Sequence, residues 1–307
     1  MRRSDIAAQW MTPLFRWFED ADTFNTWAAS LEPLRVAAED YIGRREYFEG
    51  YCWVCNRTHQ MLVRSGAMFG DNVNLREGLL CEGCGLSNRK RLMYCAVLNE
   101  QRYLSGCTGE SLLLEGLSPL QTALSKAVPG LIGSEYLGDE CVPGVEYALP
   151  DGQRARHESL TKLSFPDGTL RLVVHLDVLE HIPDYRAALR ESYRALVQGG
   201  SMVFTCPFFA QRKKPLVRAR LCADGTIEHL EPPEIHGDPL SGDGILAWYH
   251  HGWGLMDDLR EAGFADVELG CCYDPFSGFV SNNFHGGGYG LMLPIVIRAH
   301  KGAQACC

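Results

Sequence analysis

Hydrophobic and polar positions change period along residues 170–208, and this stretch is the most informative part of the chain. It opens with a short apolar run, followed by an acidic turn that carries Asp177, Glu180 and His181. An amphipathic segment with helical spacing comes next, and a pair of glycines leads into a second apolar run. A strand, a helix and a second strand in this order predict one crossover unit of a parallel sheet.

Residues up to about position 45 are predicted to form helices. Apolar side chains recur there at helical spacing in two stripes, Ile6, Trp10, Leu14 and Phe18, then Phe24, Trp27, Leu31 and Leu34. A stripe rich in Trp and Phe is expected to pack on the body of the protein. A cap over a functional site and a homodimer contact through these helices stay open as alternatives.

Four of the thirteen cysteines form two CxxC pairs, Cys52 with Cys55 and Cys81 with Cys84. Two such pairs place four thiolates around one tetrahedral ion at sulfur distances of about 2.3 Å, which predicts a closed structural zinc site. The alternatives are two disulfides, which the lack of a secretory signal disfavours, and a redox CxxC, which needs no second pair. Because four thiolates complete the site, His59 is predicted to be a surface residue.

Length and composition fit a globular protein. The chain has 307 residues, enough for one doubly wound domain and an appended module, with 46% hydrophobic and 22% charged residues. No apolar run is long enough to cross a bilayer, and the N-terminus lacks the apolar segment of a secretory signal. We therefore expect a cytoplasmic protein without a membrane partner.

The formal net charge is -9, from 38 acidic and 29 basic side chains. An acidic chain must concentrate its basic residues if it is to neutralise phosphates, so a nucleic-acid partner is disfavoured. Two basic clusters exist, Arg89-Lys90-Arg91 and Arg212-Lys213-Lys214 with Arg218 and Arg220. Short runs of like charge are expected to form solvated faces.

The stretch from 170 to 208 resembles the second half of class I S-adenosylmethionine-dependent methyltransferases of type 11. Their fourth strand ends in a phrase similar to DVLEHI, which begins here at Asp177. Their fifth strand follows a phrase similar to LxPGG, which is LVQGG here, with Gln198 in place of the proline. The resemblance covers roughly residues 110–297. It implies an α/β fold, with a Rossmann-like, seven-stranded, mostly parallel sheet and helices on both faces.

This fold is expected to follow a helical segment and a small zinc-binding module. We predict an N-terminal helical segment at 1–45, a zinc-binding module with its following helix at 46–101, and the methyltransferase domain at 102–307. A long irregular segment at 208–247, rich in Pro, Gly and Asp, is predicted to be an insertion that forms a lid or substrate wall.

The first strand of the resembled fold departs from the family pattern. The family shows an acidic residue followed by GxGxG, whereas this chain has Glu115, Gly116 and Ser118 at the turn, with one glycine. Glycines let the backbone approach the methionine part of the cofactor closely. The turn is predicted to be an alternative cradle for S-adenosylmethionine, and loss of the cofactor is the competing explanation.

The resemblance implies further cofactor contacts downstream. Glu135, followed by Tyr136, ends the second strand, where an acidic side chain accepts hydrogen bonds from the ribose hydroxyls. Glu158 is expected to bond the adenine amino group, with the backbone at Ser159 and Leu160 lining the ring.

His175 and Asp177 end the fourth strand and are expected to lie beside the sulfonium. A base is required if the acceptor arrives protonated, and histidine suits that task near neutral pH. His236, His251 and His181 are the candidate catalytic residues, and structural hydrogen bonding is the alternative for each.

The resemblance implies a methyltransferase, and we expect it to act on an oxygen or nitrogen of a small polar metabolite, such as a secondary-metabolite, amino-acid-derived or sugar-like molecule. The cysteine spacing adds a structural zinc module in front. Two alternatives stay open. Ribosomal-RNA guanine methyltransferases also place a cysteine-rich zinc domain before this fold, although the acidic net charge counts against an RNA substrate. The other alternative is a non-catalytic binding protein on a decayed methyltransferase fold.

Overall fold

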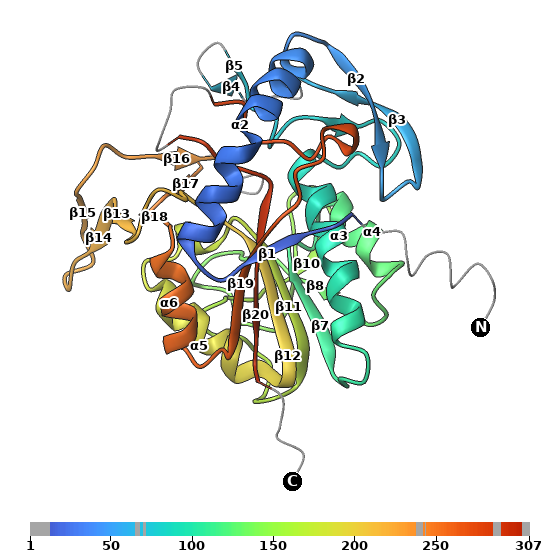
Figure 1. Ribbon diagram of the computed structural model, residues 1–307. Coiled ribbons are helices and arrows are strands. Elements are labelled where there is room, and N and C mark those ends of the chain that lie inside the picture. Colours follow the sequence, from blue (N-terminus) through green and yellow to red (C-terminus); the bar gives the residue numbers. More distant parts are fainter. Residues whose placement is uncertain are drawn as a thin grey trace.

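A seven-stranded sheet forms the centre of the molecule (Figure 1). The computed structural model describes residues 13–64, 68–69, 72–237, 242, 244–284 and 290–302. Across the sheet the strand order is β1-β19-β20-β12-β11-β7-β8. The bounds are Arg16–Phe18 for β1, Glu110–Leu114 for β7, Leu131–Gly133 for β8, Leu170–Leu176 for β11, Leu196–Thr205 for β12, Asp266–Cys271 for β19 and Ile295–His300 for β20.

Most of these strands run in one direction. β8, β7, β11 and β12 pair in parallel, β20 is antiparallel to both β12 and β19, and β1 is antiparallel to β19. Beyond β8, a parallel bridge between Glu135 and His157 extends the pairing by one step. The predicted fold class, a Rossmann-like and mostly parallel seven-stranded sheet, is confirmed.

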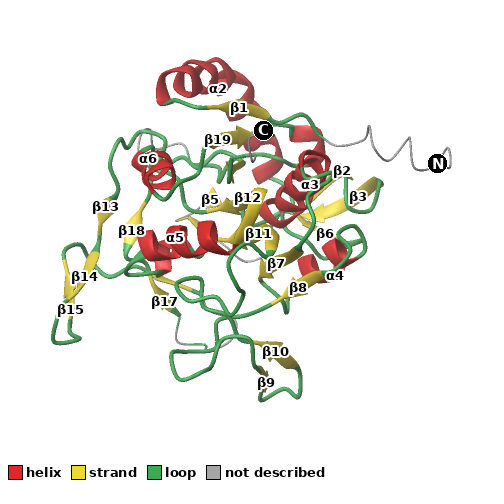
Figure 2. Ribbon diagram, turned by 90° about the horizontal axis from the view of Figure 1, so that it is seen from below, coloured by secondary structure: helices red, strands yellow, loops and turns green. Residues whose placement is uncertain are grey.

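Helices cover both faces of the sheet (Figure 2). Helices α5 (Tyr185–Ala195) and α6 (Gly254–Glu261) pack on one face, and α3 (Asn88–Tyr103) and α4 (Pro119–Ser125) pack on the other. The sheet is therefore buried on both sides, as parallel sheets are.

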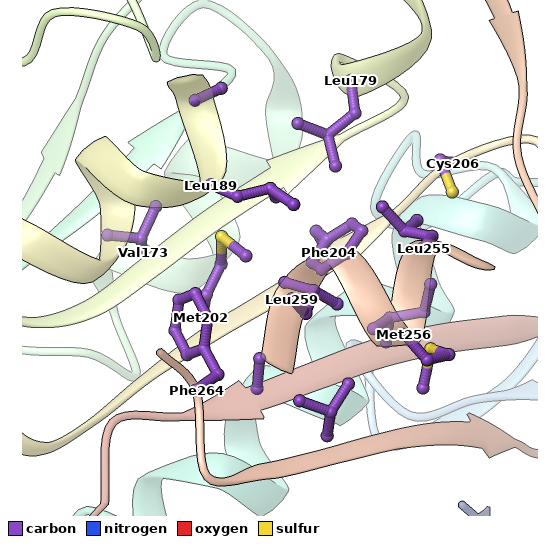
Figure 3. Packing of buried hydrophobic residues seen from close by; sticks show 14 of the residues in the cluster. Val173, Leu179, Leu189, Met202, Phe204, Cys206, Leu255, Met256, Leu259 and Phe264 are labelled. Carbon is purple, nitrogen blue, oxygen red and sulfur yellow. The ribbon is translucent and has the colours of Figure 1, made fainter. Parts of the chain in front are cut away.

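Alternate residues of β11 enter the two cores. Val173 packs on the α5 side, whereas Leu172 and Val174 pack on the α3 side. Figure 3 shows the α5 side, where Leu189 of α5 approaches Phe204 of β12. Burial on both faces explains why this strand appears in the sequence as an uninterrupted apolar run.

The prediction of a helix through Leu14 and Phe18 is wrong. Residues 16–18 form strand β1 at the edge of the sheet, and Leu14 is exposed. The strand forms because Trp17 lies over Gly270 of β19, where a Cβ atom would come within 2.5 Å of the indole ring, while Phe18 enters the core. Tertiary pairing overrides the four-residue spacing here. The first two members of that stripe, Ile6 and Trp10, lie outside the described residues.

The long helix α2 (Ala21–Gly43) follows the predicted stripe only in its first half. Phe24 is buried in the core and Trp27 packs against it. Farther along, Leu34 is exposed, and the helix buries Arg35 and Glu39 instead. The homodimer contact through the N-terminal helices stays a prediction.

Glu39 ties α2 to the segment that follows β19. Its carboxylate accepts hydrogen bonds from the Ser281 backbone N (2.8 Å), the Ser281 hydroxyl (2.7 Å) and the Tyr273 hydroxyl (3.2 Å). Arg35 Nη1 donates to the same carboxylate at 2.9 Å. A buried charge needs such partners, and their positions fix where the helix crosses the protein.

A small antiparallel sheet carries the four clustered cysteines. Strands β2 (Tyr47–Cys52), β3 (Arg57–Leu62) and β6 (Leu80–Cys81) form it in that order. A short pair, β4 (Met68–Phe69) and β5 (Asn72–Val73), lies between β3 and β6 in the sequence. We call residues 47–87 the cysteine module. Figure 1 shows this module above the sheet, at the end where α3 begins.

The remaining short elements lie mostly between β12 and α6. Three two-stranded pairs form there: β13 (Leu216–Val217) with β18 (Tyr249–His250), β14 (Ala219–Leu221) with β15 (Ile227–His229), and β16 (Ile235–His236) with β17 (Ile245–Leu246). The hairpin of β9 (Glu146–Ala148) and β10 (Arg154–Arg156) and the 3-10 turns η1 (Leu179–His181) and η2 (Pro275–Ser277) complete the set. Within the described ranges, every helix is too short or too polar to span a bilayer.

Candidate functional site

Acidic residues follow three neighbouring parallel strands at the edge that faces the cysteine module. Glu115 follows β7, Glu135 lies beyond β8, and Asp177 follows β11. The carboxyl ends of parallel strands meet at one edge of a sheet, which is where ligands bind in open α/β folds. This edge is the candidate site.

Asp177 forms the strongest polar contact at this edge. Arg76 of the cysteine module donates to both of its carboxylate oxygens, at 2.9 and 3.0 Å, and Thr205 donates to one of them at 2.8 Å. Arg89 lies 3.4 Å away. The two guanidinium groups outweigh burial and hold the pKa of Asp177 well below its ordinary value of 3.8.

The backbone of Asp177 is also unusual, with a φ of 50° in the left-handed region. Non-glycine residues seldom adopt this region, and they do so where surrounding contacts determine the conformation. The bonds from Arg76 and Thr205 supply such contacts. The chain therefore turns sharply at the end of β11 and directs the next turn, η1, along the edge.

The basic cluster at the start of α3 is not a solvated face. Arg89 pairs with Asp177 and with Glu77, Lys90 pairs with Glu115, and Arg91 is fully buried. The prediction from charge alone was wrong, because the helix leaves the cysteine module along the acidic edge of the sheet.

The glycine-poor turn after β7 packs tightly against β8. A Cβ atom at Gly116 would lie 2.7 Å from the backbone N of Ser134, so this position requires glycine for close backbone approach. Ser118 caps α4 by accepting a hydrogen bond from Leu120 N at 3.2 Å. Gly116, the one glycine in this turn, therefore allows the turn to pack closely against the end of β8.

Glu135 supports the same turn from the neighbouring strand. Its carboxylate accepts a hydrogen bond from Leu117 N at 2.8 Å. Tyr136, the next residue, is half exposed and donates its hydroxyl proton to Asp139 at 2.6 Å. The structure thus brings Glu115, Gly116, Ser118 and Glu135 together at one place.

Glu158 lies farther along this edge and is fully buried. It accepts hydrogen bonds from Arg156 Nε (2.9 Å), Ser164 N (2.9 Å) and Ser164 Oγ (2.5 Å). Ser159 shares a hydrogen bond with a neighbouring threonine, and the Leu160 side chain enters the core. These residues form one ordered turn, whose carboxylate is already well satisfied.

Two of the histidines predicted for the site, His175 and His251, lie in the core rather than at the edge. His175 stacks on Phe204 at 4.7 Å, and His251 lies between the rings of Tyr185 (4.8 Å) and Tyr249 (5.7 Å). Both imidazoles are fully enclosed, and desolvation lowers the pKa of each to about 3. Neutral rings in such surroundings pack as flat, weakly polar groups.

His181 and His236 meet at the edge, although 55 residues separate them in sequence. His236 Nδ1 lies 3.2 Å from His181 Nε2, and the two rings are nearly perpendicular. His181 Nδ1 bonds the backbone O of Leu246 at 2.9 Å. The insertion therefore contacts η1 through two histidines, His236 of the insertion and His181 of η1.

Glu234 and His250 belong to this group and were missed by the sequence analysis. Glu234 bonds His236 Nε2 at 3.0 Å and His250 Nε2 at 2.9 Å. These hydrogen bonds lower the pKa of Glu234. The only sequence signal was the proximity of Glu234 to His236, since the contact with His250 depends on how the insertion folds back.

Arg76 was also missed, and no sequence pattern points to it. It lies in an irregular part of the cysteine module, 101 residues before its partner Asp177. Only the docking of the module brings the two side chains together.

The four cysteines of the CxxC pairs converge in the cysteine module. Their sulfur atoms all lie within 4.8 Å of one another, with Cys52 and Cys84 at 3.7 Å and Cys55 and Cys81 at 4.0 Å. Tetrahedral thiolates about 2.3 Å from one zinc ion would be separated by roughly 3.8 Å. Burial and the neighbouring sulfurs raise the pKa of Cys55 to about 12. A coordinated cation stabilises the thiolate and so lowers this pKa.

His59 lies beside this cluster without joining it. Its Nε2 accepts a hydrogen bond from Arg57 at 2.9 Å. Gly83 leaves room for the ring, since a Cβ atom there would lie 2.4 Å from His59 Nε2. The donor set is therefore the four thiols, which fits zinc.

Comparison with known proteins gives one family match. Residues 136–204 match the family model described as a methyltransferase domain, a region that runs from the end of β8 into β12. A search of curated protein sequences found no match.

Several solved structures resemble the chain at low identity. They include an S-adenosylmethionine-dependent methyltransferase from Mesorhizobium loti (16% identity, TM-score 0.38, 67% of this chain and 97% of that chain) and a possible histamine N-methyltransferase from Thermotoga maritima (15%, 0.34, 69% and 91%). A third is the CcbJ methyltransferase from Streptomyces caelestis (15%, 0.37, 70% and 90%). Likenesses this weak carry no argument about the chemistry of this chain.

The pairing of Asp177 with the arginines predicts how one substitution behaves with pH. Asp177→Asn should lower the free energy of unfolding by about 3 kcal/mol, because two buried guanidinium groups lose their anion. The folded-state pKa lies below 3.8, so this stabilisation is fully present above about pH 5 and is lost only as pH falls below 3.8. Urea unfolding between pH 7 and pH 5 should therefore show a constant penalty.

Asp257→Asn is the matched control, since Asp257 pairs with Arg260 on the surface and its side chain is 75% exposed. It should cost less than about 1 kcal/mol. A penalty for Asp177→Asn that matches this control, or that disappears by pH 5, would contradict the assignment.

Proposed function

We propose that this protein, an S-adenosylmethionine-dependent methyltransferase, transfers the methyl group to an oxygen or nitrogen of a small polar metabolite, such as a secondary-metabolite, amino-acid-derived or sugar-like molecule. The observation that carries the proposal is the convergence of two sets of residues at one edge of the sheet. Carboxylates at the strand ends can accept hydrogen bonds from a nucleoside cofactor, and the His181–His236 pair suits an acceptor that must lose a proton.

The strand ends provide donors and acceptors that fit S-adenosylmethionine. Its ribose hydroxyls and ammonium group donate hydrogen bonds, which the carboxylates of Glu115 and Glu135 can accept. The bond from Leu117 N already orients Glu135 at the turn. Glu158 is satisfied by Arg156 and Ser164, so its bond to the adenine amino group requires exchange of one of these partners.

Asp177 supports the site and does not contact the cofactor directly. Both of its oxygens are engaged by Arg76, so it places two guanidinium groups at the edge rather than facing the sulfonium alone. Arginine presents donors in a geometry that matches a carboxylate. Either arginine could meet the carboxylate of the cofactor's methionine part only by exchanging a bond with Asp177 or Glu77.

When bound, S-adenosylmethionine supplies an electrophilic methyl group on a sulfonium that leaves as a neutral thioether. The protein's part is to align the acceptor and to exclude bulk water. His181 and His236 handle the acceptor's proton, because both rings lie at the edge and neither is enclosed. We leave His251 out of this role, since its ring is fully buried.

The charge on the cysteine module favours a small molecule over RNA. In the part of the module that the structure describes, Arg57 and Arg64 are exposed, opposed by the exposed Glu49 and Glu82. Its remaining arginine, Arg76, pairs with Asp177. A module that recognised RNA would need a basic surface to neutralise phosphates.

The cysteine module is proposed to bind one structural zinc ion through Cys52, Cys55, Cys81 and Cys84. Four thiolates leave no open coordination position, so the ion has no place for a substrate. Its role is to hold the loop that carries Arg76 and the start of α3, which carries Arg89. Zinc binding thereby supports the acidic edge without taking part in the reaction.

The activity itself is tested with isotopically methyl-labelled S-adenosylmethionine. The full-length protein is incubated with a pool of polar metabolites or with total RNA, and each pool is analysed by mass spectrometry. We expect a labelled methyl group on a small molecule and none on RNA. Label in RNA alone would contradict the substrate class, and the absence of any S-adenosylmethionine binding in calorimetry would remove the enzyme assignment.

Substitution of Glu135 tests the cofactor site. Glu135→Ala should weaken S-adenosylmethionine binding by about 1 to 3 kcal/mol through lost charged hydrogen bonds. Glu135→Gln should weaken it less, since the amide oxygen still accepts the proton of Leu117 N. Calorimetry measures both affinities, with the exposed Glu140→Ala as control. Equal affinity for Glu135→Ala and the control would refute the assigned role.

Substitution of a thiol tests the zinc site. Cys55→Ser should abolish zinc binding and lower the thermal midpoint, because the metal stabilises the folded module. Elemental analysis and calorimetric melting give the two readouts. Cys222→Ser, in the insertion, is the matched control and should retain zinc. Stoichiometric zinc in Cys55→Ser would count against the tetrathiolate site.

A further inference from the structure

A second group of ligand-type side chains lies at the sheet edge, away from the four cysteines. It consists of Glu180, His181 and His236, and one oxygen or nitrogen from each lies within 4.8 Å of the others. Glu180 and His181 belong to η1, directly after β11, and His236 belongs to β16 of the insertion. Two distant parts of the chain thus bring these side chains together.

Hydrogen bonds on the outer side of each ring fix which nitrogen carries the proton. His181 Nδ1 faces a backbone carbonyl, the O of Leu246 at 2.9 Å, and must donate to it. His236 Nε2 lies 3.0 Å from the carboxylate of Glu234 and donates to it. In neutral rings, His181 Nε2 and His236 Nδ1 therefore present lone pairs.

These two lone pairs point at each other across 3.2 Å. Two acceptors at that distance repel unless a positive group lies between or beside them. The rings could turn away only by giving up their bonds to Leu246 and Glu234. A proton shared by the two rings, or a cation bound between them, would remove this repulsion.

Glu180 completes the group with a buried carboxyl. The residue is fully enclosed, and both carboxyl oxygens lack a hydrogen-bond partner among the described residues. One of them lies 3.7 Å from His181 Nε2. An unpaired buried carboxyl is costly, and a bound cation removes that cost.

We propose that Glu180, His181 and His236 bind a divalent transition-metal cation, at a site separate from the four-cysteine site. Ligands about 2.1 Å from one ion, at angles near those of a tetrahedron or octahedron, lie roughly 3.0 to 3.5 Å apart. The separations of 3.2 and 3.7 Å are close to this range. Two imidazoles and one carboxylate suit Zn²⁺, Co²⁺ or Fe²⁺ better than the all-oxygen cations.

The surroundings match those of a metal site beyond the ligands themselves. Metal-binding histidines typically donate their second N–H to a carbonyl or carboxylate, as His181 does to Leu246 and His236 does to Glu234. Glu234 is held in turn by His250 at 2.9 Å and by Arg218 at 3.3 Å. The outer groups orient both rings before any ion binds.

Three protein ligands leave coordination positions open, as in catalytic rather than structural sites. Because the His236 side chain is 31% exposed, these positions are reachable from the surface. An oxygen of the acceptor entering there would favour O-methylation over N-methylation, a use that rests on the proposed function. The histidines then act on the acceptor's proton through the ion: the O–H proton goes to solvent, the oxygen bonds the methyl carbon, and the carbon–sulfur bond breaks to the neutral thioether.

Co²⁺ is the probe for the site, because its visible spectrum reports the ligands. Full-length protein that carries its zinc is titrated with Co²⁺ in the absence of S-adenosylmethionine, by calorimetry and absorbance. We expect one equivalent to bind with weak d–d bands and without thiolate charge-transfer absorption. Anomalous diffraction from Co²⁺-soaked crystals should place the ion at Glu180, His181 and His236.

Variants locate the ion in solution. Glu180→Gln and His236→Ala should each abolish this equivalent, and Glu234→Gln should weaken it by about 10- to 100-fold through the loss of outer orientation. His229→Ala, an exposed histidine of the same insertion, is the matched control and should bind normally. If a variant fails to fold, the diffraction experiment on the unchanged protein still decides.

Three outcomes would overturn the inference: no Co²⁺ equivalent beyond the four-cysteine site, an equivalent that survives both Glu180→Gln and His236→Ala, or an anomalous peak elsewhere. The first would mean that the histidine pair shares a proton instead. Methyl transfer without Co²⁺ binding would overturn this inference alone. Co²⁺ binding without methyl transfer to any metabolite would leave it standing and count against the proposed function.

Discussion

The ionic contact of Asp177 with Arg76 and Arg89 is the interaction on which the rest of the site depends. It joins the cysteine module to the end of β11, across 101 residues of sequence, and it stabilises an aspartate in the left-handed backbone region. That conformation directs η1 along the edge of the sheet. The positions of Glu180 and His181 follow from this turn, so one cluster of charges links the cysteine module to η1.

Helix α3, which follows the cysteine module, also contacts the strand ends at this edge. Lys90 of α3 reaches Glu115 after β7, while Arg89 reaches Asp177 after β11. The helix that leaves the cysteine module thus neutralises two adjacent strand ends. A structural ion in the module would act on the reaction only indirectly, by keeping these cations in place.

The insertion supplies the other half of the site. Its hairpin of β16 and β17 brings His236 and Leu246 to His181, and Glu234 links the hairpin to His250. In the sequence this segment is irregular and rich in turn residues. That pattern predicts a lid or substrate wall, but it does not indicate which residues the segment contacts. Only the fold shows that its polar residues fix the orientation of both histidines.

The sequence alone determined the features that depend on local spacing. These are the succession of strand β11, helix α5 and strand β12, the two CxxC pairs and the acidic residues that follow successive strands. These follow from periods of burial and from ligand spacing within short segments. It failed at Phe18, where an edge strand replaces a helix, at Arg89 and Lys90, which face carboxylates instead of solvent, and at Arg76 and Glu234, which no pattern marks. The tertiary structure decided these, because the free energy of a buried charge depends on the partner that folding brings to it.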